Sequence, residues 1–287
     1  MNYATTVERK IAMNIGIRLH DVEAGDIAHR LHVAHEQGFG CAHVALSKVF
    51  DGYKMTLPEL TPGWAMSVKR AFAKENLDVA VLGCYLNLAT PDEAALKATQ
   101  EVYKAHLRFG SVLGAGVVGT ETGAPNIDYH FEEACHTQEA LDRFLFGLEP
   151  VVKYAESVGQ ILALEPVFKH IMWNPKQARK VLDSIGSPNL QIIFDPVNLL
   201  HESNYEQRDE IFAEAMDLLC DEIAVLHIKD FNIVDGKLVS CGAGTGMMDY
   251  TEILKFAREK KPDIHATLED TKPENAVSCR KFIAERM

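Results

Sequence analysis

The chain has 287 residues, of which 47% are apolar and 24% are charged, so it is long and apolar enough for one large domain with a buried core. Its formal net charge of −12 argues against a nucleic-acid partner, because binding a polyanion depends on basic side chains that neutralise phosphates. Six scattered cysteines without a CxxC pair, a polar amino-terminal stretch and no apolar run of membrane-spanning length predict a reduced, cytoplasmic protein without a membrane partner.

Strand-like and helix-like segments alternate along the chain from residue 11 onward. Short apolar runs rich in β-branched residues predict strands at residues 11–19, 42–46, 77–84, 112–119, 160–164, 191–194, 223–228 and 264–268. Helical spacing of apolar residues predicts helices at residues 24–37, 64–75, 93–108, 136–157, 175–185, 205–220, 249–260 and 274–286. We expect Thr90 and Asn174 to cap the amino ends of two of these helices.

Eight strand–helix units with short connections predict an α/β fold with a parallel sheet. This number of units in a chain of this length favours a single-domain (β/α)8 TIM barrel over residues 11–287, preceded by a tail at residues 1–10. The rival fold, a doubly wound sheet, normally has a glycine-rich phosphate turn after its first strand, and none follows here.

A glycine-rich segment at residues 242–246 precedes the seventh predicted helix. Such a segment can bind an anion through its free N–H groups. It has neither a Walker lysine nor an adjacent Rossmann strand, so we interpret it as a turn.

Four polar residues each follow an apolar run at the end of a predicted strand: Glu165, Asp195, His227 and Glu269. They are separated by 30, 32 and 42 residues, and one strand, one helix and two loops use roughly 30 to 40. We therefore expect the four side chains to meet at the carboxyl ends of successive parallel strands. Three carboxylates and one imidazole in one place predict a site for a divalent metal ion.

The motifs around these residues, LALEP, IIFDPVN, VLHIKD and ATLED, resemble those of the xylose isomerase-like superfamily of TIM barrels. The branch they resemble most is that of the sugar phosphate isomerases and epimerases. The resemblance implies that Glu165, Asp195, His227 and Glu269 hold one divalent ion. We expect manganese, with magnesium or cobalt as alternatives, because hard oxygen ligands with one histidine suit these ions better than a thiolate-rich zinc site does.

The sequence departs from the D-tagatose 3-epimerase-like members of this superfamily at three positions. Asn198 stands where their histidine follows the aspartate, Ile233 replaces an arginine and Ile171 replaces a glutamate. These departures argue against a ketohexose 3-epimerase, although the metal chemistry is shared.

Further polar residues lie in loops that build the pocket of such a barrel. The candidates for substrate contact follow strand ends and are Arg18, Lys48, Glu121, Asn198 and Lys229. His170, five residues after Glu165, is a candidate acid or base because its ordinary pKa lies near neutrality. For each of them the alternative is a solvated or capping residue. We interpret the other histidines as surface or core residues.

We expect the protein to act on a small sugar or polyol by abstracting a proton beside a carbonyl, through a metal-stabilised enediolate. Glu165 and Glu269 would act as base and acid, giving an isomerase or epimerase. The same site also suits a dehydratase or lyase, acting on an inosose or dehydroshikimate or by β-elimination of a glycoside. The remaining alternatives are a metal-dependent endonuclease, which the acidic charge disfavours, and a non-catalytic carbohydrate-binding barrel or subunit. A homo-oligomer is compatible with each of these functions.

Overall fold

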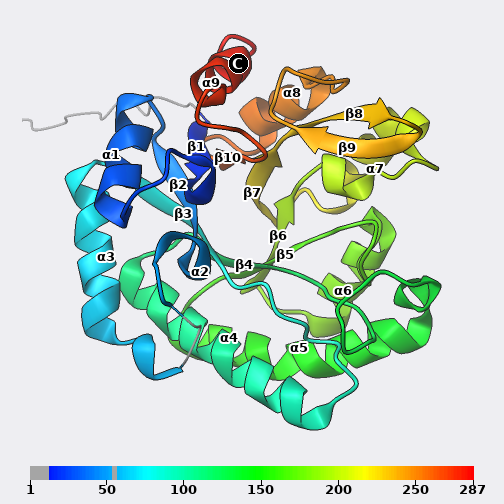
Figure 1. Ribbon diagram of the computed structural model, residues 1–287. Coiled ribbons are helices and arrows are strands. Elements are labelled where there is room, and N and C mark those ends of the chain that lie inside the picture. Colours follow the sequence, from blue (N-terminus) through cyan, green and yellow to red (C-terminus); the bar gives the residue numbers. More distant parts are fainter. Residues whose placement is uncertain (1–12, 54–56) are drawn as a thin grey trace, which may run out of the picture.

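The computed structural model describes residues 13–53 and 57–287, so the predicted tail at residues 1–10 lies outside the described part (Figure 1). Within that part, eight parallel strands close into one barrel in the order β1-β10-β7-β6-β5-β4-β3-β2, which confirms the predicted TIM barrel. The barrel strands are β1 (Asn14–Arg18), β2 (Cys41–Ala45), β3 (Asp78–Gly83), β4 (Val117–Glu121), β5 (Leu162–Glu165), β6 (Leu190–Phe194), β7 (Ile223–Ile228) and β10 (His265–Leu268).

Helices surround the barrel and cover the outward faces of its strands, except for the short helix α2 (Leu46–Val49), which directly follows β2 and carries Lys48 at the mouth of the barrel (Figure 1). They are α1 (Ile27–Glu36), α2 (Leu46–Val49), α3 (Pro62–Lys74), α4 (Glu93–Leu113), α5 (Gln138–Val158), α6 (Pro175–Ile185), α7 (Arg208–Leu218), α8 (Thr251–Lys260) and α9 (Ala276–Ala284). In the part of the chain that is described, none of them is long and apolar enough to cross a lipid bilayer. The six cysteines are free thiols.

The barrel strands are apolar on both faces because helices cover the outside and side chains fill the inside. Every residue of β2 and of β5 is buried, which explains why these strands appear in the sequence as continuous apolar runs rather than as alternating ones. Within these two strands the polar residues are His43, in the middle of β2, and Glu165, at the end of β5. A buried polar side chain in such a strand needs a partner inside the barrel.

The prediction that Thr90 caps the helix starting at Glu93, which is α4 in the structure, is wrong. Asp92 takes that role, because its Oδ1 accepts a hydrogen bond from the backbone N–H of Ala95 at 2.9 Å. The carbonyl oxygen of Thr90 instead accepts two hydrogen bonds from the guanidinium of Arg143. Asn174 does cap α6, and its Oδ1 accepts from the N–H of Gln177 at 2.8 Å.

Several predicted boundaries also differ from the structure. Helix α4 continues to Leu113, so the fourth strand begins at Val117 and not at residue 112. The predicted helices at 24–37, 136–157, 205–220, 249–260 and 274–286 begin two to three residues later in the structure, where caps or short 3-10 turns precede them. The structure also contains an antiparallel hairpin that was not predicted. It is formed by β8 (Asp230–Val234) and β9 (Lys237–Cys241) and lies outside the barrel beside α7 (Figure 1).

Gly147, in the middle of α5, lets the loop after β3 pass close to this helix. A Cβ atom at this position would collide with the carbonyl oxygen of Leu88, which is backbone and cannot rotate away. We expect Gly147→Ala to lower the free energy of unfolding by about 1–3 kcal/mol, despite the higher helix propensity of alanine. Urea unfolding followed by circular dichroism measures the change.

Gly63, in the first turn of α3, is the matched control for this substitution. A Cβ atom there would meet nothing within 4 Å, so Gly63→Ala should leave stability unchanged or raise it slightly. Equal effects of the two substitutions would contradict the role assigned to Gly147.

Candidate metal centre

Glu165, Asp195, His227 and Glu269 come together at the carboxyl ends of β5, β6, β7 and β10. These four strands are neighbours in the barrel, so residues far apart in the sequence end side by side. Glu165 is the last residue of β5, His227 lies near the end of β7, and Asp195 and Glu269 directly follow β6 and β10. One ligand atom from each of the four lies within 4.8 Å of those of the other three.

The four side chains are buried, with residue exposures of 5% or less. The Nδ1 atom of His227 lies 3.2 Å from Oε2 of Glu165 and 3.3 Å from Oε1 of Glu269. Asp195 is oriented by the backbone, because its Oδ1 accepts hydrogen bonds from the N–H groups of Val197 and Asn198 at 2.9 and 3.1 Å.

The charges of this site favour a cation. Burial alone would lower the pKa of His227, but the carboxylates of Glu269 and Glu165 outweigh it and raise that pKa to about 9. Burial, opposed by Lys229, raises the pKa of Asp195 to about 6. A field that holds an extra proton on a fully buried imidazole also attracts a metal ion.

His227 supports the same conclusion by its hydrogen bonding. Its Nε2 is buried and has no hydrogen-bond partner among the described residues, whereas its buried Nδ1 faces the carboxylates of Glu165 and Glu269. A buried ring nitrogen without a partner is costly in a structural histidine but expected in a metal ligand. The residues present therefore fit a divalent cation with mixed oxygen and nitrogen ligands.

Lys229 enters the same site from the loop after β7. Its buried ammonium group lies 2.9 Å from Oδ2 of Asp195 and 3.3 Å from Oε2 of Glu269. Burial raises the pKa of Glu269, but the charges of His227 and Lys229 outweigh it and hold the pKa well below its usual range. Glu269 therefore stays ionised.

Arg18 connects the first strand of the barrel to the last. Its guanidinium contacts Asp21 at 3.0 Å and Asp270 at 2.8 Å, and lies 3.5 Å from Oε2 of Glu269. The contact with Glu269 places Arg18 in the lining of the site, and the contacts with Asp21 and Asp270 fix its guanidinium there.

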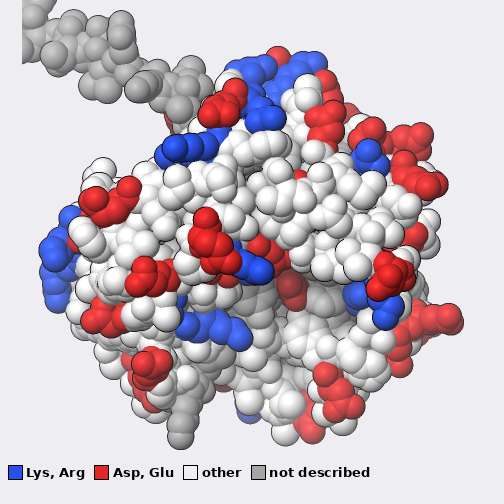
Figure 2. All heavy atoms as spheres, turned by 45° about the horizontal axis from the view of Figure 1, so that its top comes forward, with Lys and Arg blue, Asp and Glu red and all other residues white. Residues whose placement is uncertain are grey.

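A cavity of about 460 Å³ opens beside these residues. Its lining includes every substrate-contact candidate as well as His170, and Figure 2 shows a hollow with acidic atoms in its depth and basic side chains at its edge. Lys48, on the short helix α2, is exposed at this cavity. Asn198 lies deeper, and its Nδ2 donates to Oε1 of Glu165 at 2.6 Å.

Glu121 and His170 form a second polar group in the cavity, beside the four clustered ligands, because Glu121 pairs with Glu165 in the register of β4 and β5. Oε2 of Glu121 lies 3.5 Å from Nδ1 of His170 and accepts a hydrogen bond from the hydroxyl of Tyr129 at 3.3 Å. Burial, together with repulsion from Glu165, raises the pKa of Glu121 to about 7, whereas burial lowers the pKa of His170 to about 4. Near neutral pH, Glu121 thus exchanges protons readily and His170 is uncharged.

The glycine-rich segment at residues 242–246 is a turn held by Asp230, as the sequence interpretation expected. Oδ2 of Asp230 accepts from the N–H groups of Gly244 and Gly246 at 3.1 and 3.0 Å, and Oδ1 accepts from those of Phe231 and Met248 at 2.8 Å. These N–H groups are occupied by a carboxylate of the chain itself and are not available for a phosphate.

His43, in β2, is the site residue that the sequence interpretation missed by assigning it to the surface or core. It is 1% exposed, and its ring stacks on that of His227 with centroids 5.3 Å apart. A lone histidine within an otherwise small and apolar strand was the available signal, because a polar side chain buried in a barrel strand needs a partner inside the barrel.

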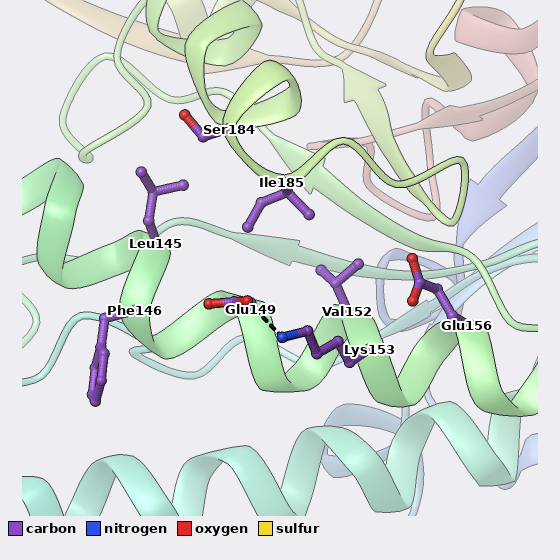
Figure 3. Close-up of a pocket in the computed structure, with 8 residues that line it drawn as sticks. All are labelled: Leu145, Phe146, Glu149, Val152, Lys153, Glu156, Ser184 and Ile185. Atoms are coloured by element: carbon purple, nitrogen blue, oxygen red, sulfur yellow. Dashed lines mark hydrogen bonds and ion pairs between the residues drawn. The ribbon is translucent and has the colours of Figure 1, made fainter.

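A second pocket, of about 270 Å³, lies outside the barrel between α5 and α6 (Figure 3). Figure 3 shows an ion pair between Glu149 and Lys153 on its α5 side, with exposed Phe146 at one end. None of the predicted site residues lines this pocket, and we assign it no role in the chemistry.

Comparison with known proteins agrees with this architecture. The family model described as xylose isomerase-like TIM barrel matches residues 31–285. The structure of 3-keto-D-glucoside 4-epimerase from E. coli has a TM-score of 0.75 at 15% identity, and the match covers 96% of this chain and 100% of that one. D-Psicose 3-epimerase from Clostridium cellulolyticum H10, solved with D-tagatose, has a TM-score of 0.71 at 17% identity, with 95% and 96% covered.

The probable 3-DHS dehydratase from Bacillus anthracis has a TM-score of 0.70 at 13% identity, with 95% of this chain and 98% of that chain covered. At such identities the likeness establishes the fold and not the activity. A comparison with curated proteins gives no match.

The bonds that Asp230 makes generate a stability prediction. In Asp230→Asn an NH2 group faces the N–H groups of Gly244 and Gly246, which lose their acceptor. We expect the free energy of unfolding to fall by about 1–3 kcal/mol, measured by urea unfolding. The control is Asp217→Asn on the exposed face of α7, which should change stability by less than about 0.5 kcal/mol. An unchanged Asp230→Asn protein would show that the carboxylate does not hold the turn.

Proposed function

This chain belongs to the xylose isomerase-like TIM barrel family, and we propose that it is a divalent-metal-dependent isomerase or epimerase of a small sugar or polyol. The observation that carries the proposal is the convergence of Glu165, Asp195, His227 and Glu269 on one buried point. A non-catalytic carbohydrate-binding barrel would have no need to bury three carboxylates together, because each is costly to desolvate.

These four residues would hold the ion, for which manganese is the first candidate and magnesium or cobalt the alternatives. When bound, the ion supplies Lewis-acid polarisation of the substrate carbonyl, which acidifies the neighbouring C–H bond. The cavity offers further polar contacts for a hydroxylated substrate through Asn198, Lys229 and Lys48. Epimerases among the similar structures make a sugar substrate a reasonable proposal for this cavity.

The two glutamates differ in their surroundings, and we assign their roles accordingly. Glu269 faces the ammonium of Lys229 and the guanidinium of Arg18, so it holds its negative charge strongly and accepts a proton poorly. Glu165 receives its hydrogen bond from the neutral amide of Asn198. We therefore assign proton abstraction from carbon to Glu165, while Glu269 would anchor the ion; both carboxylates face Nδ1 of His227.

The second candidate function is a dehydratase on the same barrel. The observation that favours it is the position of Glu121 in the cavity, where the hydroxyl of Tyr129 donates to it at 3.3 Å; burial and repulsion from Glu165 raise its pKa to about 7. A protonated carboxyl group in the cavity can deliver a proton to a leaving hydroxyl group, and neutral His170 lies 3.5 Å from it. The probable dehydratase among the similar structures agrees with this alternative.

Metal binding is tested by thermal unfolding. An ion that binds the folded chain raises its midpoint, since stabilisation grows with ligand concentration relative to Kd. We expect saturating Mn²⁺ to raise the midpoint of the wild type by several degrees and to leave that of Asp195→Asn nearly unchanged. Asp217→Asn is the control and should respond like the wild type. A wild-type midpoint that does not move with Mn²⁺, Mg²⁺ or Co²⁺ would exclude the metal site.

Catalysis is tested by hydrogen exchange at carbon. The metal-loaded protein is incubated in D2O with a panel of ketoses and keto-inositols, and carbon-bound deuterium is measured by NMR. We expect uptake with at least one substrate and a loss of about 10²-fold or more in Glu165→Gln and in Glu269→Gln. Product analysis separates the functions, because an epimer or isomer supports the first proposal and loss of water supports the dehydratase. Uptake that persists in Glu269→Gln with its metal bound would refute a role for that residue.

A further inference from the structure

Three carboxylates in the described part of the chain line the cavity: Glu121, Glu165 and Glu269. Both oxygens of Glu165 have partners, since Oε1 accepts from Asn198 at 2.6 Å and Oε2 lies 3.2 Å from Nδ1 of His227. Both oxygens of Glu269 face basic side chains. Glu121 differs, because only its Oε2 has partners among the described residues. Its side chain is 29% exposed, against 3% for Glu165 and 7% for Glu269.

Glu121 lies beside Glu165 but outside the ligand group. The two residues end neighbouring strands and are paired in the register of β4 and β5, so their side chains leave the same side of the sheet. Neighbouring strands lie about 4.8 Å apart, which places both carboxylates within reach of one small molecule. The ligand groups found within the described residues do not include Glu121. A proton gained or lost by Glu121 therefore removes no ligand from the proposed ion.

The loop after β4 fixes one oxygen of Glu121. The hydroxyl of Tyr129 donates to Oε2 at 3.3 Å, and Nδ1 of His170 lies 3.5 Å from the same atom. Tyr129 has a φ of 53°, which is rare for a residue other than glycine, and backbone strain of this kind clusters at functional sites. The side chain of Asn126 closes the loop, because it donates to the carbonyl of His130 at 2.9 Å and accepts from its N–H at 3.1 Å. Oε1 of Glu121 remains for a substrate.

The side-by-side position of Glu121 and Glu165 favours one type of proton transfer. An epimerase returns a proton to the opposite face of the carbon that it deprotonates, so it needs a second acid on that face. Glu269 is a poor acid, because Arg18 and Lys229 hold it as a carboxylate. An isomerase instead moves the carbonyl to the adjacent carbon, and a proton must then pass from one substrate oxygen to its neighbour. Two carboxylates on one side of the substrate suit this reaction.

We propose that Glu121 is a catalytic residue that carries a proton between adjacent oxygen atoms of the substrate, so that this chain is an isomerase and not an epimerase. The inference rests on the proposed function. Glu165 takes a proton from the hydroxyl-bearing carbon, the C–H electron pair forms a C–C double bond, and the carbonyl π electrons move to oxygen. The carboxylate of Glu121 takes the proton of the neighbouring hydroxyl and gives it to the former carbonyl oxygen. Glu165 returns its proton to the former carbonyl carbon, which restores both carboxylates.

The test compares two rates for one substrate in D2O. The metal-loaded protein is incubated with the ketose or keto-inositol of the panel that it exchanges fastest, and NMR measures deuterium in the recovered substrate and the amount of isomer. Deuterium uptake reports proton transfer at carbon, whereas isomer formation also requires transfer between oxygens. In Glu121→Gln we expect the ratio of isomer formation to exchange to fall by about 10²-fold or more. Mn²⁺ should still raise the thermal midpoint of this variant, because Glu121 is not a ligand.

Glu133→Gln is the matched control. Glu133 is exposed on the short 3-10 helix η3 (Glu133–His136) and does not line the cavity, so this variant should keep the wild-type ratio. Tyr129→Phe keeps the ring and removes the hydrogen bond to Oε2 of Glu121, so its ratio should fall by less than that of Glu121→Gln. Circular dichroism verifies folding, and Tyr129→Phe decides the question if Glu121→Gln does not fold.

An unchanged ratio in these two variants overturns the inference, and so does a loss of exchange together with product in Glu121→Gln, which would place Glu121 at carbon. An epimer as the product overturns it and leaves the proposed function intact, because epimerisation moves no proton between oxygens. A dehydrated product overturns it in favour of the second candidate function. A wild type that exchanges hydrogen with no member of the panel overturns the proposed function as well.

Discussion

Mutual repulsion among buried carboxylates is the constraint around which the rest of the site is arranged. Glu165, Asp195 and Glu269 lose most of their hydration at the barrel mouth, and each desolvated charge costs several kcal/mol unless a cation balances it. The chain supplies Lys229, and His227 retains a proton in the same field. The desolvation free energy of three carboxylates at neighbouring strand ends is offset only when cationic groups or ions lie among them.

The fold makes this concentration of charge possible because the ligands come from neighbouring strands. Each strand fixes the backbone of its ligand, and the backbone or a neighbouring side chain fixes the carboxylate, as the N–H groups of Val197 and Asn198 do for Asp195. Asp230, one residue after Lys229, holds the following turn in the same way. The site thus depends on hydrogen bonds whose donors are rigid, which is what precise ligand placement needs.

The amino-acid sequence was sufficient to predict the barrel and the convergence of four residues, because Glu165, Asp195, His227 and Glu269 follow apolar runs at intervals that fit successive strand–helix units. Element ends were less predictable. Asp92 and Thr90 are both good capping residues, and only the contact between Arg143 and the Thr90 carbonyl decides between them. The hairpin β8–β9 was missed because exposed strands such as Lys237–Cys241 have no buried face to impose a pattern.

His43 was missed for a different reason, which concerns distance in the chain. The residues it approaches, His227 and Glu269, lie at the other end of the sequence, and only closure of the barrel brings β2 near β10 and β7. Spacing along the chain identifies site residues on successive strands. It does not identify residues such as His43, whose strand reaches the site only because the barrel closes. The consequence is chemical as well as structural. With His43 and Arg18 beside Glu269 and Asn198 beside Glu165, the two glutamates at the barrel mouth face unlike surroundings, and this asymmetry comes from strands that are distant in the sequence.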